Sequence, residues 1–363
     1  MPFEQPTDSA SLMNSIEVSD PIRVVVADDS SFIRRAMTLL LEENPDIHVV
    51  GLAKDGRECL DLVEKLLPDV LTLDLNMPRM DGLSVLRLMV SEYAIPVIMV
   101  SALTFEGAEA TLEALELGAV DFIAKQITPR SLDIDLFKAE LVNKVKWAVQ
   151  MGRSKQGKPK SDNYKKTRIL KPDKKHTTPV DIVGIGTSTG GPIALQKIIP
   201  LLPADFPVPI VIAQHIPPQF SKSLANRLDQ KSRLKVTEAR EHDHLSKGKV
   251  LIAPGGKHLE VDKNGDVRLI PNEDHSLACP SVNKLLSSIV HRYNAGTLGV
   301  VLTGMGKDGV EGSREIQRRG GQVLVQDETS SLVYGMPRGV VEQGLADREA
   351  PLDLIAAEIL RML

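Results

Sequence analysis

Acidic, hydroxyl and ammonium side chains stand directly after short apolar runs in the first third of the sequence. Asp28 and Asp29 follow one run, Asp74 ends another, and Ser101 and Lys125 close two more. Three carboxylates brought together repel one another, so either one is protonated or all of them hold a cation. An oxygen-rich site of this kind suits Mg²⁺, which leaves coordination positions open for a phosphoryl group.

Phosphoryl chemistry assigns a role to each of these residues. Asp74 is the nucleophile toward a phosphodonor, Lys125 pairs with the phosphoryl oxygens, and Ser101 hydrogen-bonds to them. Any one of the acids alone is explained equally well as a polar cap of a strand. Three acids together with a strand-end lysine are not expected by coincidence. The sequence therefore predicts a magnesium site that accepts a phosphoryl group.

The glycine-rich loop at residues 184–190, GIGTSTG, serves either a phosphate or a nucleophile, because glycines let the chain turn sharply and leave N–H groups uncovered. The dinucleotide pattern GxGxxG fails by one residue. The candidate ribose-binding acid, Asp205, lies in a loop before the next strand rather than at the end of that strand. The Walker phosphate-loop pattern also fails, because no lysine follows the glycines. Residues 186–190 instead match GxSxG, the strand-to-helix turn that exposes a serine. Ser188 is therefore a candidate nucleophile, although a serine in such a loop is more often structural.

A serine nucleophile needs a base and a group that orients the base. His215 directly follows an apolar run, and Asp308 lies just past another in a glycine-rich turn that leaves the backbone N–H of Met305 exposed as an oxyanion donor. Taken singly, His215 is explained as a strand cap and Asp308 as a helix N-cap. Serine, histidine and aspartate at three strand ends favour acyl transfer, which needs no metal.

Alternating strands and helices must position these residues. In the first half the expected strands are 22–27, 47–51, 70–73, 95–100 and 120–124, and the expected helices include 31–43, 56–67 and 132–150. In the second half the expected strands are 180–186, 208–213, 249–253, 297–303 and 321–325, with a hairpin at 258–270. This alternation predicts two α/β domains, a doubly wound parallel sheet followed by a mostly parallel one, with function at the carboxyl ends of the strands.

Composition separates the two halves. Residues 151–178 carry ten Lys or Arg against two Asp with almost no apolar periodicity, so they cannot build a core. We therefore expect a tail at 1–20, a first domain at 21–147, a flexible linker at 148–178 and a second domain at 179–363.

The overall charge and composition exclude several classes of function. A net charge of -4 and 3% aromatic residues argue against nucleic-acid binding. No stretch is apolar enough to insert into a membrane, and two distant cysteines favour neither disulfides nor zinc, so a cytoplasmic protein is expected.

The first half resembles response-regulator receiver domains through VVVADDS, LTLDLNMPRMDG, MVSA and DFIAK, over about residues 20–145. The resemblance implies a flavodoxin-like fold and makes Phe122 the aromatic that repacks on phosphorylation. One residue departs from the family pattern, since Gln126 stands where a proline usually follows the lysine. The resemblance also implies a magnesium ion held by Asp28, Asp29, Asp74 and the backbone carbonyl of Asn76.

The second half resembles the catalytic domain of the chemotaxis methylesterase family, CheB, through GIGTSTGGP, AQHIPP, IAPGGKHLE, LTGMGKDG and YGMPRG. Receiver, linker and catalytic domain occur in that family's order. The resemblance implies an esterase that demethylates glutamates on bacterial chemoreceptors and deamidates receptor glutamines, with the histidine kinase CheA as phosphodonor. It makes Ser188, His215 and Asp308 the catalytic triad and Met305 the oxyanion donor, and the Mg²⁺ belongs to the receiver.

Other classes of function remain open on the residues alone. The second domain is alternatively a nucleotide-dependent oxidoreductase or a binding module for a signalling partner, but the glycine fingerprint and a helix-turn-helix pattern are both missing. The stretch EHDH at 241–244 has no third ligand cluster nearby, which disfavours a metal site. Because a linker of about 28 residues keeps the domains at high effective concentration, we expect the unphosphorylated receiver to dock over the Ser188 crevice and exclude a receptor helix. The alternative is direct stimulation, in which the phosphorylated receiver improves the catalytic site itself.

Overall fold

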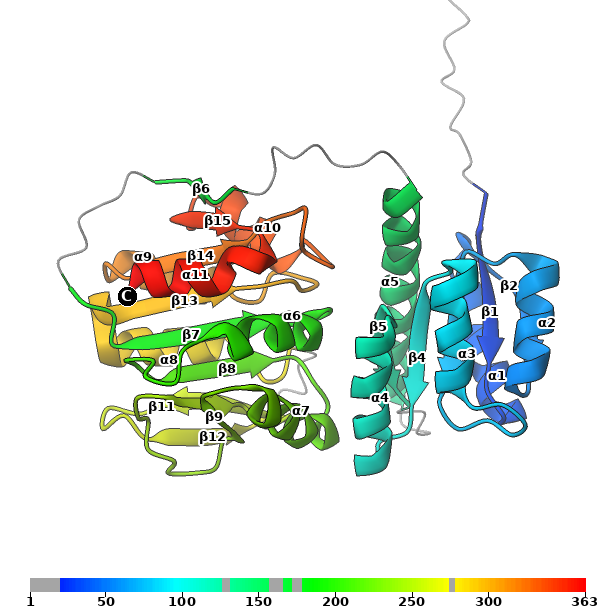
Figure 1. Ribbon diagram of the computed structural model, residues 1–363, viewed down its shortest axis with the longest axis horizontal. Coiled ribbons are helices and arrows are strands. Elements are labelled where there is room, and N and C mark those ends of the chain that lie inside the picture. The colour runs from blue at the N-terminus through cyan, green and yellow to red at the C-terminus, as the bar shows by residue number, and fades with distance from the viewer. Residues whose placement is uncertain (1–19, 126–130, 157–165, 172–177, 274–277) are drawn as a thin grey trace, which may run out of the picture.

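The computed structural model describes residues 20–125, 131–156, 166–171, 178–273 and 278–363. Two α/β domains lie side by side (Figure 1). Almost all of the predicted tail, the departure at Gln126 and much of the predicted linker lie outside the described residues.

The amino-terminal domain is a five-stranded parallel sheet in the order β2-β1-β3-β4-β5, which confirms the predicted doubly wound fold. Its strands are β1 (Ile22–Ala27), β2 (Ile47–Ala53), β3 (Val70–Asp74), β4 (Val97–Ser101) and β5 (Asp121–Ala124). Its helices are α1 (Ser31–Glu42), α2 (Gly56–Leu66), α3 (Gly82–Leu88) continued by the π-helical turn η1 (Met89–Tyr93), α4 (Phe105–Leu117) and α5 (Ser131–Gln156). Strands β3 and β4 are buried throughout, as expected for apolar runs covered by helices on both faces. The strand order reverses between β1 and β3, and this places the acids that follow β1 beside the acid that ends β3.

The carboxy-terminal domain is built on an eight-stranded sheet in the order β6-β15-β14-β13-β7-β8-β10-β9, parallel except for β6. Its strands are β6 (Arg168–Ile169), β7 (Ile182–Thr187), β8 (Ile210–Gln214), β9 (Lys235–Glu238), β10 (Lys249–Ile252), β13 (Thr297–Val301), β14 (Gln322–Gln326) and β15 (Arg348–Ala350). The predicted hairpin is confirmed as β11 (Lys257–Val261) and β12 (Val267–Pro271). Its helices are α6 (Gly191–Ile198), α7 (Pro218–Lys231), α8 (Val282–Tyr293), α9 (Val310–Arg318), α10 (Met336–Glu342) and α11 (Leu352–Met362), with short 3₁₀ turns at η3 (Ile199–Leu201) and η4 (Asn294–Gly296).

The segment predicted as a linker is more ordered at both ends than its composition indicated. Helix α5 continues six residues past its predicted end at Gln150, because Lys, Arg and Gln are good helix formers and no proline occurs before Pro159. At the other end β6 joins the catalytic sheet. Arg168 pairs there with the buried carboxylate of Glu349 at 2.8 Å, and a buried charge requires such a partner.

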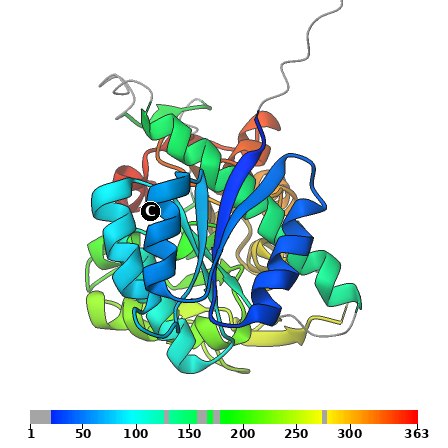
Figure 2. The same ribbon diagram turned by 90° about the vertical axis from the view of Figure 1, so that its right-hand side faces the viewer.

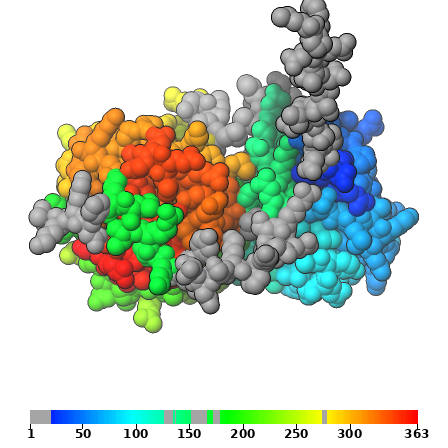
Figure 3. Space-filling view, turned by 90° about the horizontal axis from the view of Figure 1, so that it is seen from above, coloured from blue at the N-terminus to red at the C-terminus, as the bar shows by residue number. Residues whose placement is uncertain are grey.

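The receiver turns α4, β5 and α5 toward the catalytic domain (Figures 1 and 2). Seen from above, α5 lies along the boundary between the two domains (Figure 3). The carboxyl end of β7 and the start of α7 point at this boundary, so the site on the catalytic sheet faces the receiver.

Candidate functional site

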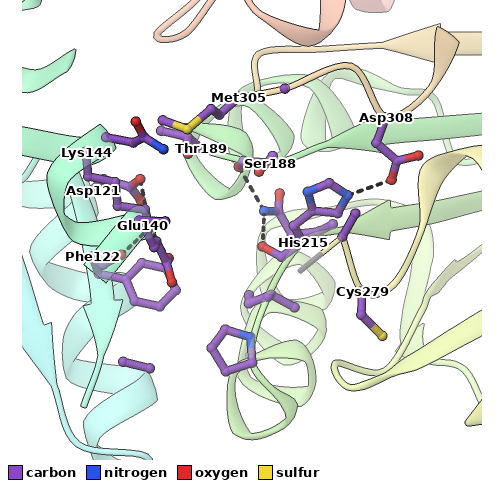
Figure 4. Close-up of a pocket in the computed structure, with 18 of the residues that line it drawn as sticks. Asp121, Phe122, Glu140, Lys144, Ser188, Thr189, His215, Cys279, Met305 and Asp308 are labelled. Atoms are coloured by element: carbon purple, nitrogen blue, oxygen red, sulfur yellow. Dashed lines mark hydrogen bonds and ion pairs between the residues drawn. The ribbon is translucent and has the colours of Figure 1, made fainter. Parts of the chain in front are cut away.

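Three adjacent strands of the catalytic sheet carry the predicted triad at their carboxyl ends (Figure 4). Ser188 follows β7, His215 follows β8, and Asp308 lies in the turn between β13 and α9. The strand order reverses between β7 and β13, because the chain leaves β7 toward β8 and returns on the other side through β13. Such reversal points are where open α/β sheets bind ligands.

The loop after β7 holds Ser188 on a tight strand-to-helix turn. The backbone N–H of Ser188 donates to Thr303 at 3.1 Å, and its carbonyl accepts from the N–H of Gly191 at 2.8 Å. Gly190 has a left-handed φ of 78°, which glycine adopts without strain. Any side chain at Gly191 would collide with Gln214, since a Cβ there would lie 1.9 Å from its Oε1. The glycines of this loop therefore allow the tight turn that carries Ser188. The hydrogen bond from Ser188 to Thr303 joins this loop to the segment that follows β13.

His215 and Asp308 form a hydrogen-bonded pair, with Nε2 of the ring 2.8 Å from Oδ2 of the carboxylate. The carboxylate also accepts from the backbone N–H groups of Val282 at 2.7 Å and Asn283 at 2.9 Å, at the amino-terminal end of α8. Burial raises the pKa of Asp308, but the hydrogen bonds from His215 and from the helix outweigh it and hold that pKa below its usual value. The acid is thus kept ionised where it orients the imidazole.

Ser188 and His215 line the same cavity, but the Ser188 hydroxyl makes no hydrogen bond to the imidazole among the described residues. Because Nε2 is used by Asp308, Nδ1 is the ring nitrogen left to receive the serine proton. Catalytic hydrogen bonds are often long in a free enzyme and tighten only when substrate is bound. The arrangement places the candidate nucleophile, base and orienting acid on one wall of the cavity.

Two residues that line the same cavity have backbone N–H groups without a hydrogen-bond acceptor in the part of the chain that the structure describes. One is Met305, which the sequence predicted as an oxyanion donor, and the other is Thr189. The sequence analysis did not single out Thr189, although the residue after the nucleophile supplies an oxyanion donor in many GxSxG enzymes. These two N–H groups are the candidate donors for the negative charge of a tetrahedral intermediate.

Gln214 and Asn283 position the triad and were also missed by the sequence reasoning. The Nε2 of Gln214 donates to the carbonyls of Ser188 and His215, each at 2.9 Å, and so sets the spacing of nucleophile and base. Asn283 accepts from the N–H groups of Gly309 and Gly312, each at 2.9 Å, and fixes the turn that carries the acid. Gln214 stands directly before the histidine at a strand end, which is a readable signal, whereas no motif marks Asn283.

The acidic site of the receiver is organised around Lys125. Its ammonium lies 2.8 Å from Asp28 and 2.9 Å from Asp74. Burial raises the pKa of Asp74 and the ion pair with Lys125 opposes that rise. Burial lowers the pKa of Lys125, but its two carboxylate partners outweigh it and the net pKa is raised. The lysine is therefore held as a cation beside Asp74, which is the charge that the predicted phosphoryl-binding role requires.

Carboxylate oxygens of Asp28, Asp29 and Asp74 lie within 4.8 Å of one another, and this is the one group with metal-ligand spacing among the described residues. Three hard oxygen donors are the chemistry that Mg²⁺ prefers, so the residues fit that ion. Asn76 lies in the exposed loop after β3, two residues past Asp74. In the EHDH stretch His244 pairs with Asp266 and Glu241 pairs with Arg268, so its side chains serve surface ion pairs.

Ser101 and Phe122 contact α4 and α7, the two helices that meet across the domain boundary. The hydroxyl of Ser101 is buried and donates to the carbonyl of Gly107 in the first turn of α4 at 3.2 Å. The ring of Phe122 packs on Phe220 of α7. Ser101 is therefore hydrogen-bonded to the receiver helix at the boundary, and Phe122 makes a contact across it.

Ion pairs between α4 and α7 add to this boundary. Arg227 binds Glu116 through two nitrogens, one of them at 2.7 Å, and Lys231 binds the same carboxylate. The hydrogen bond from Arg227, opposed by burial and supported by Lys231, lowers the pKa of Glu116 to about 2. The pairing is geometrically specific because a guanidinium matches a carboxylate with two parallel bonds.

Lys144 of α5 supports the receiver side of the boundary. It is buried, pairs with Asp121 at 3.1 Å and Glu140 at 2.8 Å, and donates to the carbonyl of Phe122. Burial lowers its pKa, but the two carboxylates outweigh that effect and the net pKa is raised. A buried ion pair with both partners in place fixes the backbone of β5 beside the aromatic contact.

The two domains enclose a cavity of about 630 Å³. Ser188, His215 and Met305 lie on the catalytic wall (Figure 4). Asp121, Phe122, Glu140 and Lys144 lie on the receiver wall. A receiver with an acidic strand-end site, joined to an α/β domain that carries serine, histidine and aspartate at adjacent strand ends, defines a hydrolase of two-component signalling.

Comparisons with known proteins identify the family. The receiver-domain family model matches residues 24–136, and the CheB methylesterase model matches residues 183–359. The chain is 42% identical to the protein-glutamate methylesterase/protein-glutamine glutaminase of Lawsonia intracellularis, over 93% of this chain and 98% of that protein. It is 44% identical to the protein of the same name from Symbiobacterium thermophilum, over 96% and 98%. The chain belongs to the CheB methylesterase family.

Solved structures align with each domain separately. The crystal structure of the Thermotoga maritima CheB methylesterase catalytic domain is 41% identical, covers 51% of this chain and all of that one, and has a TM-score of 0.49. The response regulator domain of Thermotoga maritima CheB is 44% identical, covers 36% of this chain and 97% of that one, with a TM-score of 0.33. Within the described ranges, no helix combines the length and the apolar character needed to span a bilayer.

Proposed function

We propose that this chain hydrolyses γ-glutamyl methyl esters on bacterial chemoreceptors under the control of phosphorylation at Asp74. The observation that carries the proposal is the placement of Ser188 on one cavity wall with the His215–Asp308 pair. It is supported by relatives whose printed name is protein-glutamate methylesterase/protein-glutamine glutaminase. The proposal includes a cytoplasmic location, for which the buried thiol of Cys59 is suitable.

The reaction proceeds in two halves. Ser188 Oγ attacks the ester carbonyl while His215 takes its proton, and Asp308 keeps the imidazole in the tautomer that accepts at Nδ1. The N–H groups of Met305 and Thr189 stabilise the oxyanion. His215 then protonates the departing methoxide, methanol leaves, and water releases the glutamate carboxylate by the same route. This chemistry uses no cofactor.

The same side chains serve a second leaving group. Attack on a glutamine side chain forms the identical acyl-enzyme and releases ammonia, protonated by His215. An amide is the poorer substrate because its nitrogen leaves only when protonated. The glutaminase activity in the relatives' name is therefore part of the proposed function, at a lower rate than ester hydrolysis.

Phosphoryl transfer to Asp74 supplies the control. The histidine kinase CheA is the proposed donor, and Asp28, Asp29, Asp74 and the carbonyl of Asn76 are the groups that would hold Mg²⁺, which when bound offsets phosphoryl charge. Lys125, released from its pairing with free Asp74, binds the phosphoryl oxygens. Ser101 turns from α4 toward them, and Phe122 follows, which withdraws the ring from Phe220.

Closure of the two domains is the inhibited state in this proposal. The methylated glutamate lies on a receptor helix, and α5 stands across the cavity that holds Ser188. A long linker keeps the receiver near, so weakening the interface by a few kcal/mol changes the open population substantially.

The test is to incubate the purified chain with membranes containing methylated chemoreceptor and to measure methanol. Acetyl phosphate with Mg²⁺ should increase the rate, and Ser188→Ala should abolish it. Methanol release that persists in Ser188→Ala, with the variant folded, would remove the serine from the proposed role.

A further inference from the structure

The closed arrangement leaves the catalytic groups in contact with open space. Ser188 is partly exposed, and the His215 side chain retains 14% of its accessible surface although the receiver is docked. Both side chains line the interdomain cavity together with the backbone of Met305. The site is covered, but it is not filled.

The contacts that hold the domains together are separate from the triad. Phe122 packs on Phe220, and Glu116 pairs with Arg227 and Lys231 on the outer side of α4 and α7. Among the described residues, no hydrogen bond or ion pair joins a receiver side chain to Ser188, His215 or Asp308. The His215–Asp308 bond of 2.8 Å is formed in this arrangement. The pairing of the proposed base with its orienting acid therefore does not require domain opening.

The size of the cavity distinguishes between substrates. A helix with its side chains is about 10 Å wide. Helix α5 of the receiver lines the cavity together with Ser188, so a receptor helix would have to displace α5 to reach the serine. A single capped amino acid is much smaller, and the cavity volume of 630 Å³ is in the range of about 300–1,000 Å³ typical of small-molecule sites.

We propose that the closed, unphosphorylated enzyme hydrolyses small γ-glutamyl methyl esters as fast as the open enzyme does, so that the receiver controls only the access of protein substrates. This inference rests on the proposed function of the Ser188 site. It assigns to the interdomain cavity a substrate class of its own, the γ-methyl esters of a single acylated glutamate.

The chemistry in the closed state is balanced with water as the only other reactant. A bond forms from Ser188 Oγ to the γ-carbonyl carbon as the bond from that carbon to the methoxy oxygen breaks. The serine proton passes to His215 and then to the methoxide, which leaves as methanol. Water adds to the acyl-enzyme, gives one proton through His215 to Ser188, and the free γ-carboxylic acid leaves.

The experiment compares two substrates on the full chain. The small probe is N-acetyl-glutamate γ-methyl ester α-amide, and the large probe is methylated chemoreceptor in membranes. Arg227→Glu opposes Glu116 and so opens the interface. Lys235→Glu is the matched control, since it makes the same charge change where the partner, Asp229, lies in the same domain. Methanol release is measured without phosphodonor.

The expected result is a ratio that depends on substrate size. Relative to wild type, Arg227→Glu should hydrolyse receptor at least tenfold faster and the small ester within twofold, while Lys235→Glu changes neither. If the small ester gains as much as the receptor, its hydrolysis requires opening and the inference is overturned. An unreactive small ester in every active variant overturns it as well. Where Arg227→Glu does not fold, Glu116→Gln removes the same ion pair from the receiver side.

Two further arms separate this inference from the proposed function. Ser188→Ala must abolish hydrolysis of the small ester, since persistence would place that activity elsewhere. Hydrolysis of the small ester by an enzyme that never acts on receptor would reject the proposed function and leave the cavity inference standing. A series of methylated peptides of increasing length should show the gain from Arg227→Glu increasing with peptide length.

Discussion

The ring of Phe122 in the receiver stacks on the ring of Phe220 in the catalytic domain, with centroids 4.6 Å apart and planes inclined by 14°. Phe220 lies in the first turn of α7, five residues after His215. Lys144 holds the other partner, because its ammonium donates to the carbonyl of Phe122 and lies 5.3 Å from the ring centroid. The aromatic contact between the domains is therefore connected by a short segment to the proposed base.

Loss of this aromatic stack should weaken the closed state and raise the activity of the unphosphorylated enzyme on receptor. In Phe122→Leu the apolar volume is largely kept, but an aromatic pair contributes about 0.5–1.5 kcal/mol beyond its buried area. We expect the unphosphorylated rate on receptor to rise roughly two- to tenfold, since 1.4 kcal/mol is about a factor of ten in an equilibrium. Methanol assays with and without acetyl phosphate measure this. An unchanged basal rate would show that the stack does not hold the closed state.

Salt, and not mild acid, should open the domains. The hydrogen bond from Arg227 lowers the pKa of Glu116 to about 2 in the closed state, below its ordinary value of 4.5. The ion pair therefore stabilises the closed state at all pH values above 4.5. This stabilisation is lost only as the pH falls toward 2. The hydrogen-exchange protection factors of amides in α4 and α7, which correct for the pH dependence of intrinsic exchange, should be the same at pH 5.5 and pH 8. They should fall at 1 M NaCl because exposed ion pairs are screened. Opening already at pH 5.5 would contradict the assignment.

The triad should act as one unit. Ser188→Ala should lower the rate on methylated receptor by about 10³ or more with the fold intact, and adding His215→Ala should cost little further. Circular dichroism checks the fold. Losses that multiply in the double variant would mean that the two side chains act independently.

Asp74 should be needed for activation and not for the basal rate. Because Asp74 lies in the receiver, away from the cavity wall that carries Ser188, Asp74→Ala should keep the unphosphorylated activity while abolishing the response to acetyl phosphate and Mg²⁺. Removing Mg²⁺ with EDTA should have the same effect on the wild type. A response that survives in Asp74→Ala would move the phosphoryl acceptor to another residue.

Gln214→Met should slow the chemical step. The variant keeps the length of the side chain but loses both hydrogen bonds to the carbonyls of Ser188 and His215. Each such bond contributes about 1 kcal/mol, so we expect kcat to fall roughly 10- to 100-fold with KM little changed. Thermal melting provides the control for stability. A rise in KM at unchanged kcat would assign Gln214 to substrate binding instead.

Much of this molecule follows from residues that are neighbours along the chain. Apolar runs followed by Asp28, Asp74 or Ser188 identify both the strands and the residues at their carboxyl ends, because parallel sheets bring those ends to one edge. The short strands β9, at one edge of the sheet, and β15, next to the other edge, were not predicted, since three or four partly polar residues carry little periodic signal. The order β13-β7-β8 that gathers serine, histidine and aspartate is likewise invisible in a linear pattern.

Sequence alone determined the two sheets, the acidic site and the candidate nucleophile, because each depends on local spacing and on residue chemistry. Tertiary structure decided which partners those residues meet. The amino-terminal end of α8 at Asp308, the bridging amide of Gln214 and the stack of Phe122 on Phe220 all join segments distant in the chain. Their geometry comes from how helices pack on the sheets and how the domains close, and such contacts depend on shape and burial in three dimensions rather than on the order of residues.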